Sequence, residues 1–401
     1  MSNNNKTPAI RFKGFTDTWE QRKLGDTVQI TMGQSPDGST YSDVPSDYIL
    51  VQGNADLQNG WVSPRVWTSQ MTKKADAGDL IMSVRAPAGA MGKTAYNAVI
   101  GRGVAAIKGN EFIYQLLEKM DSDGYWKALS CGSTFESLNS DNIKNADVLI
   151  PDVAEQEKIG EYFLAIDRLI TLHQRKCDKL IQFKAAMLKK MFPQNGADKP
   201  EIRFKGFTDA WEQRKFSELT EIRSASRVHK DEWQSSGVPF YRSSDVMAAL
   251  NGTENEKAFI SEELYEKLSA VSGKLEKGDV LVTGGGSVGK PYIVPNNEPL
   301  YTKDADLLWI KNNENLDPYF VYTFFFSPTF TDYLNSVSHV GTIAHYTITQ
   351  LGETPITLPC VSEQQKIGDY FRNLDFLITL HQRKCDKYKS IKSGLIRKLF
   401  P

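Results

Sequence analysis

The sequence has no run of eighteen apolar residues, and its first residues, MSNNNKTPAI, do not show the charged-then-apolar pattern of a secretion signal. We therefore expect no membrane-spanning helix and no export signal, and we expect residues 1–9 to be a flexible lead-in. Only four cysteines occur, Cys131, Cys177, Cys360 and Cys385, and none forms a CxxC pair. This pattern is typical of reduced thiols in a cytoplasmic protein and disfavours a zinc site.

Motifs of several enzyme classes are also missing or incomplete. The sequence contains no Asn-Pro-Pro-Tyr methyltransferase motif and no cluster of histidine and cysteine ligands. Pro151-Asp152 with Glu157-Lys158 superficially resembles a PD…ExK nuclease site, but the Glu-x-Lys spacing is absent. We therefore expect a non-catalytic chain with no metal ion and no cofactor of its own.

The charge is close to balanced, with a formal net charge of −1 and a pI near 6.6. A protein that binds DNA is usually more basic, so this number argues against DNA binding. The distribution is uneven, because residues 155–192 carry eight Lys/Arg against five Asp/Glu and residues 363–400 carry nine against four. Such basic segments are either solvated helix faces or contacts for an anion. On its own, the chain is expected to bind nucleic acid weakly unless a partner adds positive charge.

Two pairs of segments are nearly identical. Residues 10–23 read IRFKGFTDTWEQRK and residues 202–215 read IRFKGFTDAWEQRK, which differ at one position of fourteen. Residues 155–179 and 363–387 agree at nineteen of twenty-five positions, whereas the segments between the repeats share only a faint pattern. The chain is therefore two tandem halves, each a nearly constant frame around a variable head.

Two long helices are predicted, over residues 154–193 and 362–401, because heptad-spaced apolar stripes lie between flanking prolines. The stripes consist of Ile159, Ile166, His173, Leu180 and Met187 in the first copy and Ile367, Leu374, His381, Tyr388 and Leu395 in the second. A helix this long, roughly 57 Å, with a one-sided apolar stripe is not expected to be stable alone in water, so each is expected to pair antiparallel with its repeat in a coiled coil. The two histidines are expected to be packed core residues, with a switch or ligand role as the alternative.

The predicted fold class is α+β, a pseudo-two-fold tandem repeat of two mixed α/β heads separated by the coiled coil. The heads are residues 10–153 and 202–361, with a polar linker at residues 194–201. Strands are expected at residues 48–51, 79–82, 280–282 and 292–294, and helices at residues 112–120 and 318–326.

A glycine-rich stretch in each half resembles part of a nucleotide-binding loop. Residues 284–290 read GGGSVGK, but Pro291 takes the place of the required Ser or Thr and a strand pattern follows. Both halves keep Gly-Asp followed by Gly-x-x-Gly-Lys, which pairs Gly89, Gly92 and Lys93 with Gly286, Gly289 and Lys290. The stretch is either a tight structural turn or a loop in which backbone amides and a lysine approach a DNA phosphate.

Polar residues of the types that read base edges occur in the expected loops of both heads. The candidates for DNA contact are Gln34, Ser35, Gln52, Asn54, Arg85, Lys93, Ser133 and Thr134 in the first head, and Arg227, Arg242, Ser243, Ser244, Ser287, Lys290, Thr342, His345 and Tyr346 in the second.

The repeated frame resembles the specificity subunits of Type I restriction–modification systems over the full length of the chain. The residues that carry the resemblance are RFKGFTDxWEQRK before each head and EQxKIGxYF…LITLHQRK after it. In that family, each of two target-recognition domains reads one half of a split DNA sequence. The two helices space those domains and dock two methyltransferase subunits, and nuclease-translocase restriction subunits complete the complex.

The resemblance implies double-stranded DNA, two methyltransferase subunits and restriction subunits as partners, and no membrane. S-adenosylmethionine would belong to the methyltransferase, and ATP and Mg²⁺ to the restriction subunit. Docking on the helices would be shared with residues 10–23 and 202–215, and a longer helix would widen the unread spacer of the target. Two alternatives stay open from the residues alone: a repeat scaffold that binds protein or glycan, and a P-loop ATPase.

Overall fold

The computed structural model describes residues 7–130, 137–194, 196–304, 306–338 and 345–401. The chain forms two compact units, and each unit combines one head with parts of both long helices. Unit 1 consists of Met1–Gln174 with Arg383–Pro401, and unit 2 is Arg175–Gln382. No helix in the described part of the chain is long and apolar enough to cross a membrane.

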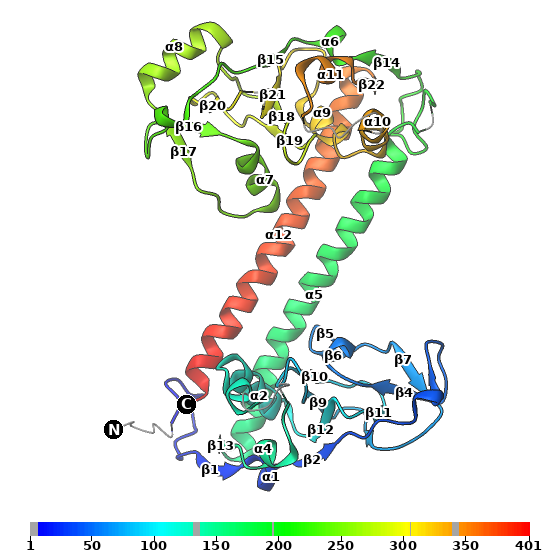
Figure 1. Cartoon of the computed structure of the whole chain (residues 1–401), viewed down its shortest axis with the longest axis vertical. Helices are drawn as coiled ribbons and strands as arrows, with labels where there is room; N and C mark the ends of the chain where they lie inside the picture. Colours follow the sequence, from blue (N-terminus) through cyan, green and yellow to red (C-terminus); the bar gives the residue numbers. More distant parts are fainter. Residues whose placement is uncertain (1–6, 131–136, 195, 305, 339–344) are drawn as a thin grey trace. The chain divides into compact units, whose positions relative to one another are not determined.

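The first head contains two main sheets (Figure 1). One has the order β2 (Gln29–Met32), β12 (Val104–Lys108), β9 (Leu80–Ser83), β10 (Met91–Lys93), β6 (Trp61–Val62), β5 (Leu57–Gln58). The other has the order β3 (Tyr41–Ser42), β7 (Val66–Thr68), β4 (Tyr48–Val51), β11 (Ala98–Ile100), β8 (Lys74–Ala75). The helices are α1 (Leu24–Thr27), α2 (Glu111–Ser122), α3 (Tyr125–Ser130) and α4 (Ser140–Lys144), with 3-10 turns η1 (Gly38–Thr40) and η2 (Asn54–Asp56).

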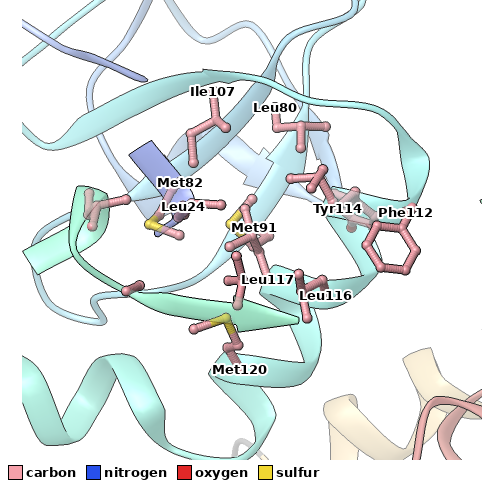
Figure 2. Close-up of a cluster of buried hydrophobic side chains, with 14 of the residues drawn as sticks. Leu24, Leu80, Met82, Met91, Ile107, Phe112, Tyr114, Leu116, Leu117 and Met120 are labelled. Carbon is pink, nitrogen blue, oxygen red and sulfur yellow. The ribbon is translucent and has the colours of Figure 1, made fainter. Parts of the chain in front are cut away.

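Helix α2 covers one face of the first of these sheets. It begins where the Asn110 side chain accepts a hydrogen bond from the Ile113 amide, and its apolar face is buried. Figure 2 shows Leu80, Met82 and Ile107 of the sheet gathered with Leu116, Leu117 and Met120 of α2. This core fixes the strands whose ends carry the candidate site.

The second head is built in a similar way. One sheet has the order β15 (Ile222–Ser224), β21 (Leu307–Ile310), β18 (Val280–Thr283), β19 (Pro291–Ile293), and another has the order β17 (Ala258–Ile260), β16 (Val238–Tyr241), β20 (Tyr301–Thr302). The helices are α6 (Phe216–Leu219), α7 (Ser243–Asn251), α8 (Glu262–Ser272), α9 (Pro318–Phe324), α10 (Pro328–Ser338) and α11 (Ile348–Glu353), with the turn η3 (Lys230–Glu232). The strands and helices expected in the heads correspond to β4, β9, β18, β19, α2 and α9.

The long helices are α5 (Val153–Met191) and α12 (Val361–Leu399). In unit 1, Phe163 of α5 lies against Phe400, and His173 stacks on Tyr388 at 5.7 Å between ring centroids. In unit 2, Lys184 pairs with Asp375 at 2.5 Å, and Phe192 lies against Phe371. Within each unit, the contacting residues near and on α12 have lower numbers as the residue numbers on α5 rise, so the helices are antiparallel and the predicted pairing is confirmed. All ten stripe residues named above are buried or half-buried.

The repeated frame closes each head onto a long helix. In unit 1, β1 (Glu20–Lys23) pairs with β13 (Asp147–Ile150), and Arg11 donates two hydrogen bonds of 2.6 Å to the fully buried Glu155 carboxylate. In unit 2, β14 (Glu212–Lys215) pairs with β22 (Pro355–Leu358), and Arg203 binds Glu363 in the same way at 2.7 Å. The near identity of the frame thus follows from a structural task that both halves repeat.

Candidate nucleic-acid interface

Four loops of the first head meet where strands end; we call them the strand-end loops. They are residues 33–35 after β2, 52–54 after β4, 84–85 after β9, and 101–103 between β11 and β12. The loop at residues 101–103 lies between the other three, because backbone hydrogen bonds connect it, or the strand end before it, to each of them. Gln34 N donates to Ile100 O at 2.8 Å, Gly101 N donates to Val51 O at the end of β4 at 2.8 Å, and Val84 N donates to Gly103 O at 2.9 Å. Loops from both sheets therefore form one continuous surface.

Two glycines permit this close approach. A Cβ atom on Gly33 would lie 2.1 Å from the carbonyl oxygen of Gly101, and one on Gly103 would lie 2.0 Å from that of Gln52. Because both neighbours are backbone atoms, they have no side-chain freedom with which to make room. These glycines are therefore required for the loops to come together.

The second head repeats the arrangement with different side chains. Its strand-end loops follow β15, β16, β18 and β20, and they are joined by Lys303 N to Tyr241 O at 2.9 Å and Gly284 N to Asp306 O at 2.7 Å. The Ser243 hydroxyl also donates to the Asp306 carbonyl. Arg227 lies in the loop after β15, where the first head has Ser35.

Most arginines of the heads serve the fold. Among the described residues of the heads, residues 10–153 and 202–361, the arginines paired with carboxylates are Arg11, Arg22 and Arg65 in the first and Arg203, Arg214, Arg223 and Arg242 in the second. The described arginines of the two heads that form no such pair are Arg85, Arg102 and Arg227, and all three are exposed on strand-end loops. An exposed guanidinium without a carboxylate partner is suited to bind phosphate or a base edge.

The structure places several predicted residues of the first head in these loops. Gln34 and Arg85 are exposed, while Ser35, Gln52 and Asn54 are half-buried. Ser133 and Thr134 lie outside the described residues.

Lys93 does not belong to this surface. Its side chain is 9% exposed, its Nζ atom lies 2.9 Å from the Glu111 carboxylate, and it sits 4.2 Å from the Tyr114 ring centroid. Because its charge is already neutralised and shielded from solvent, we withdraw Lys93 as a DNA contact.

In the second head, the exposed candidates are Arg227, Ser244, Ser287 and His345, and Lys290 is half-buried. Arg242 and Ser243 are half-buried and bonded within the head: Arg242 pairs with Asp245 at 3.0 Å. Thr342 lies outside the described residues. Tyr346 is 1% exposed and its hydroxyl bonds Thr354, so its burial removes it from the candidate surface.

The glycine-rich stretches are equivalent hairpin loops, but in a register different from the predicted one. Met91 pairs with Met82, and Pro291 pairs with Val282. The amides of Gly89 and Gly289 each donate to the residue that ends the preceding strand, Ser83 or Thr283. Gly89 therefore corresponds to Gly289, not to Gly286, and Lys93 and Lys290 are not equivalent. The predicted pairing was wrong because it aligned the two Gly-x-x-Gly-Lys stretches by their residue types, whereas the strand pairing shifts them by three residues.

Both glycines have structural roles. Gly289 has a φ of +75° and a Cβ there would lie 2.8 Å from Phe330, while Gly89 has a φ of +105° and a Cβ there would lie 2.7 Å from Trp126. The stretch GGGSVG also matches the letters of GxGxxG and GxSxG, but both motifs need a following helix and β19 follows here. These findings favour the structural-turn interpretation over a phosphate loop.

Arg102 was missed from the sequence. Its signal was a lone arginine between Gly101 and Gly103 after an apolar strand, a pattern that places a long cation on a tight turn. No cluster of His, Cys, Asp and Glu suited to a metal ion occurs among the described residues. Cys177, Cys360 and Cys385 form no disulfide bond with a described residue, and Cys131 lies outside the described residues.

The family profile described as "Type I restriction modification DNA specificity domain" matches residues 16–182 and 208–388, one copy in each half. The chain belongs to this family. A putative type I restriction enzyme MjaX specificity subunit of Methanocaldococcus jannaschii is 28% identical over 180 residues, which cover 43% of this chain and 42% of that relative. The chain thus matches less than half of that relative's length.

Two solved structures have a fold similar to that of this chain. The S subunit of a Type-I restriction-modification system from M. genitalium aligns with a TM-score of 0.69 and 14% identity, covering 98% of this chain and 99% of that chain. A chain from a structure on complex assembly and conformational transition of the type I R-M system aligns with a TM-score of 0.52 and 16% identity, covering 95% and 97%. At these identities the likeness concerns the fold alone.

Proposed function

We propose that this chain is the DNA-specificity subunit of a Type I restriction–modification system. Each head reads one half of an asymmetric, split duplex target through its strand-end loops. The observation that carries the proposal is the segregation of arginines: those of the frame and head interiors are paired with carboxylates, while Arg85, Arg102 and Arg227 are exposed on these loops. Family membership supports the same conclusion.

The two heads present different side chains at equivalent places, so the two half-sites are expected to differ in sequence. Where the first head has Ser35, the second has Arg227, and the turn that carries Arg102 in the first head carries Asp304 and Asp306 in the second. Direct recognition in the major groove depends on which donor or acceptor faces each base pair. A change of this kind therefore changes the bases that a head selects.

The proposed partners are duplex DNA, two methyltransferase subunits and restriction subunits, and the chain itself is the non-catalytic member. The methyltransferase would bring S-adenosylmethionine, and the restriction subunit would bring ATP and Mg²⁺. A net charge of −1 supports dependence on partners, because phosphate binding needs more positive charge than this chain has. We place the complex in the cytoplasm, with the chromosome that it would methylate.

The test is selection from a random duplex library by the purified complex of this chain with its candidate methyltransferase. The selected duplexes should share one motif of two unlike halves around an unread spacer. Binding should weaken steeply with added salt. Selection of no motif by an intact complex would contradict the proposal and favour a scaffold that binds protein or glycan.

A further inference from the structure

One guanidinium on the surface of the first head is held in place by a neighbouring loop. The Ser35 hydroxyl oxygen accepts from the backbone amide of Arg102 at 3.2 Å and from its side-chain Nε at 3.4 Å. Arg102 is exposed, and it forms no ion pair with a described residue. Ser35 therefore orients the group and leaves the two terminal amino groups of Arg102 free.

The backbone under Arg102 is fixed on both sides. Gly101 donates to Val51 at 2.8 Å, and Gly103 accepts from Val84 at 2.9 Å. Gly33 N also donates to Val104 O at 3.0 Å, immediately after the turn. A long side chain on so constrained a turn loses less conformational entropy on binding than one on a free loop.

The geometry favours one kind of contact, an end-on one. An arginine that binds phosphate side-on uses Nε and one terminal nitrogen, but Nε of Arg102 is occupied by Ser35. The terminal pair of amino groups remains for an end-on contact with two adjacent acceptors. The O6 and N7 atoms of guanine in the major groove are such a pair.

Arg85 provides the contrast within the same surface. It is exposed on the adjacent loop, and no hydrogen bond of its guanidinium to a described residue orients it. The backbone carbonyl of Arg85 accepts a hydrogen bond from the Ser83 hydroxyl at 2.9 Å. An unrestrained cation of this kind is suited to a phosphate contact, which adds affinity without sequence preference.

We infer that Arg102, positioned by Ser35, reads a guanine in the half-site of the first head. This inference rests on the proposed function. In the second head, the equivalent turn carries Asp304 and Asp306, and the exposed arginine is Arg227 on the neighbouring loop. Arg227 thus contributes to the other half-site from a different direction, and its replacement serves as the matched control.

The experiment repeats the random-library selection with the complex containing Arg102→Ala, Arg102→Lys, Ser35→Ala, Arg85→Ala or Arg227→Ala. With Arg102→Ala, one guanine position in one half-site should lose its preference, with discrimination falling by about 10- to 100-fold. Arg102→Lys should relax the same position, because an ammonium lacks the two-pronged geometry. Ser35→Ala should relax that position partly, while Arg227→Ala should change only the other half-site.

The outcomes separate this inference from the proposed function. If the unmodified complex selects no split motif, the proposed function fails and the inference falls with it. If the motif is present and Arg102→Ala weakens binding to all sequences equally, as expected for Arg85→Ala, Arg102 contacts phosphate and the inference alone is overturned. Full specificity with Lys at position 102, or an unchanged motif with Ala, would overturn it as well.

Discussion

Two tryptophans at the same place in the repeat differ in one hydrogen bond, which permits a matched stability prediction. Trp19 donates from Nε1 to the Glu155 carboxylate at 3.1 Å. The indole nitrogen of Trp211 is buried and has no hydrogen-bond partner among the described residues. Their packing is alike: Trp19 lies 5.5 Å from Phe112 and Trp211 lies 5.8 Å from Phe320, measured between ring centroids.

Replacing either tryptophan by phenylalanine removes a similar contact area. Only the replacement of Trp19 also removes a hydrogen bond. A hydrogen bond to a charged group contributes about 1.5–3 kcal/mol. Trp19→Phe also leaves the buried Glu155 with one donor fewer, whereas Trp211→Phe removes a donor that was unsatisfied. Unit 1 should therefore lose about 1.5–3 kcal/mol more stability from Trp19→Phe than unit 2 loses from Trp211→Phe.

Hydrogen exchange of the β9 and β18 amides reports the stability of each unit separately, which a single unfolding midpoint does not. The β9 amides should lose protection in Trp19→Phe by more than the β18 amides lose it in Trp211→Phe. Equal losses, or a larger loss in unit 2, would refute the assignment of the Trp19 hydrogen bond as the difference between the two frames.

Three further predictions follow from contacts in the heads and helices. Gly89→Ala and Gly289→Ala should each destabilise their unit by about 2 kcal/mol or more, because a positive φ and a close aromatic side chain act together. Gly286 also has a positive φ but open space around it, so Gly286→Ala should cost about 1 kcal/mol. The same hydrogen-exchange measurement compares the three variants. Lys392→Met should destabilise unit 1 by about 3–5 kcal/mol near neutral pH, since it leaves Glu118 and Asp167 without their shared cation. Burial lowers the pKa of Lys392, but the two carboxylates outweigh burial and raise the pKa above its ordinary 10.5. The ion pair therefore stabilises the fold fully below pH 10.5, and this stabilisation is lost as the pH rises through the raised pKa. The loss of stability caused by Lys392→Met should shrink in that alkaline range, and a loss that stays constant with pH would contradict this assignment.

The frame and the long helices were predictable because repetition and periodicity are properties of the sequence itself. Heptad stripes between Pro151 and Pro193 predicted a helix that the structure places at Val153–Met191. The register of the glycine hairpins was not predictable, because the similarity between the two Gly-x-x-Gly-Lys stretches conflicts with the strand pairing, and only the ladder of backbone hydrogen bonds resolves it.

Individual site residues were harder to identify because side-chain type does not reveal whether a group is already paired. Lys93 and Arg242 have the chemistry of DNA contacts, yet each is bound to a carboxylate of its own head. The Gly-Arg-Gly pattern places Arg102 on a turn, but its position among four loops that are distant in sequence is set by the tertiary structure. The distinction between paired and unpaired cations is a property of the tertiary structure.

Recognition of a split DNA target is tested most directly by co-expressing this chain with its candidate methyltransferase and mapping methylated bases across the genome of a host. A single split motif is expected, with unlike halves and methyladenine in both of them. An assembled complex that adds no methylation, or that methylates without a split motif, would contradict it.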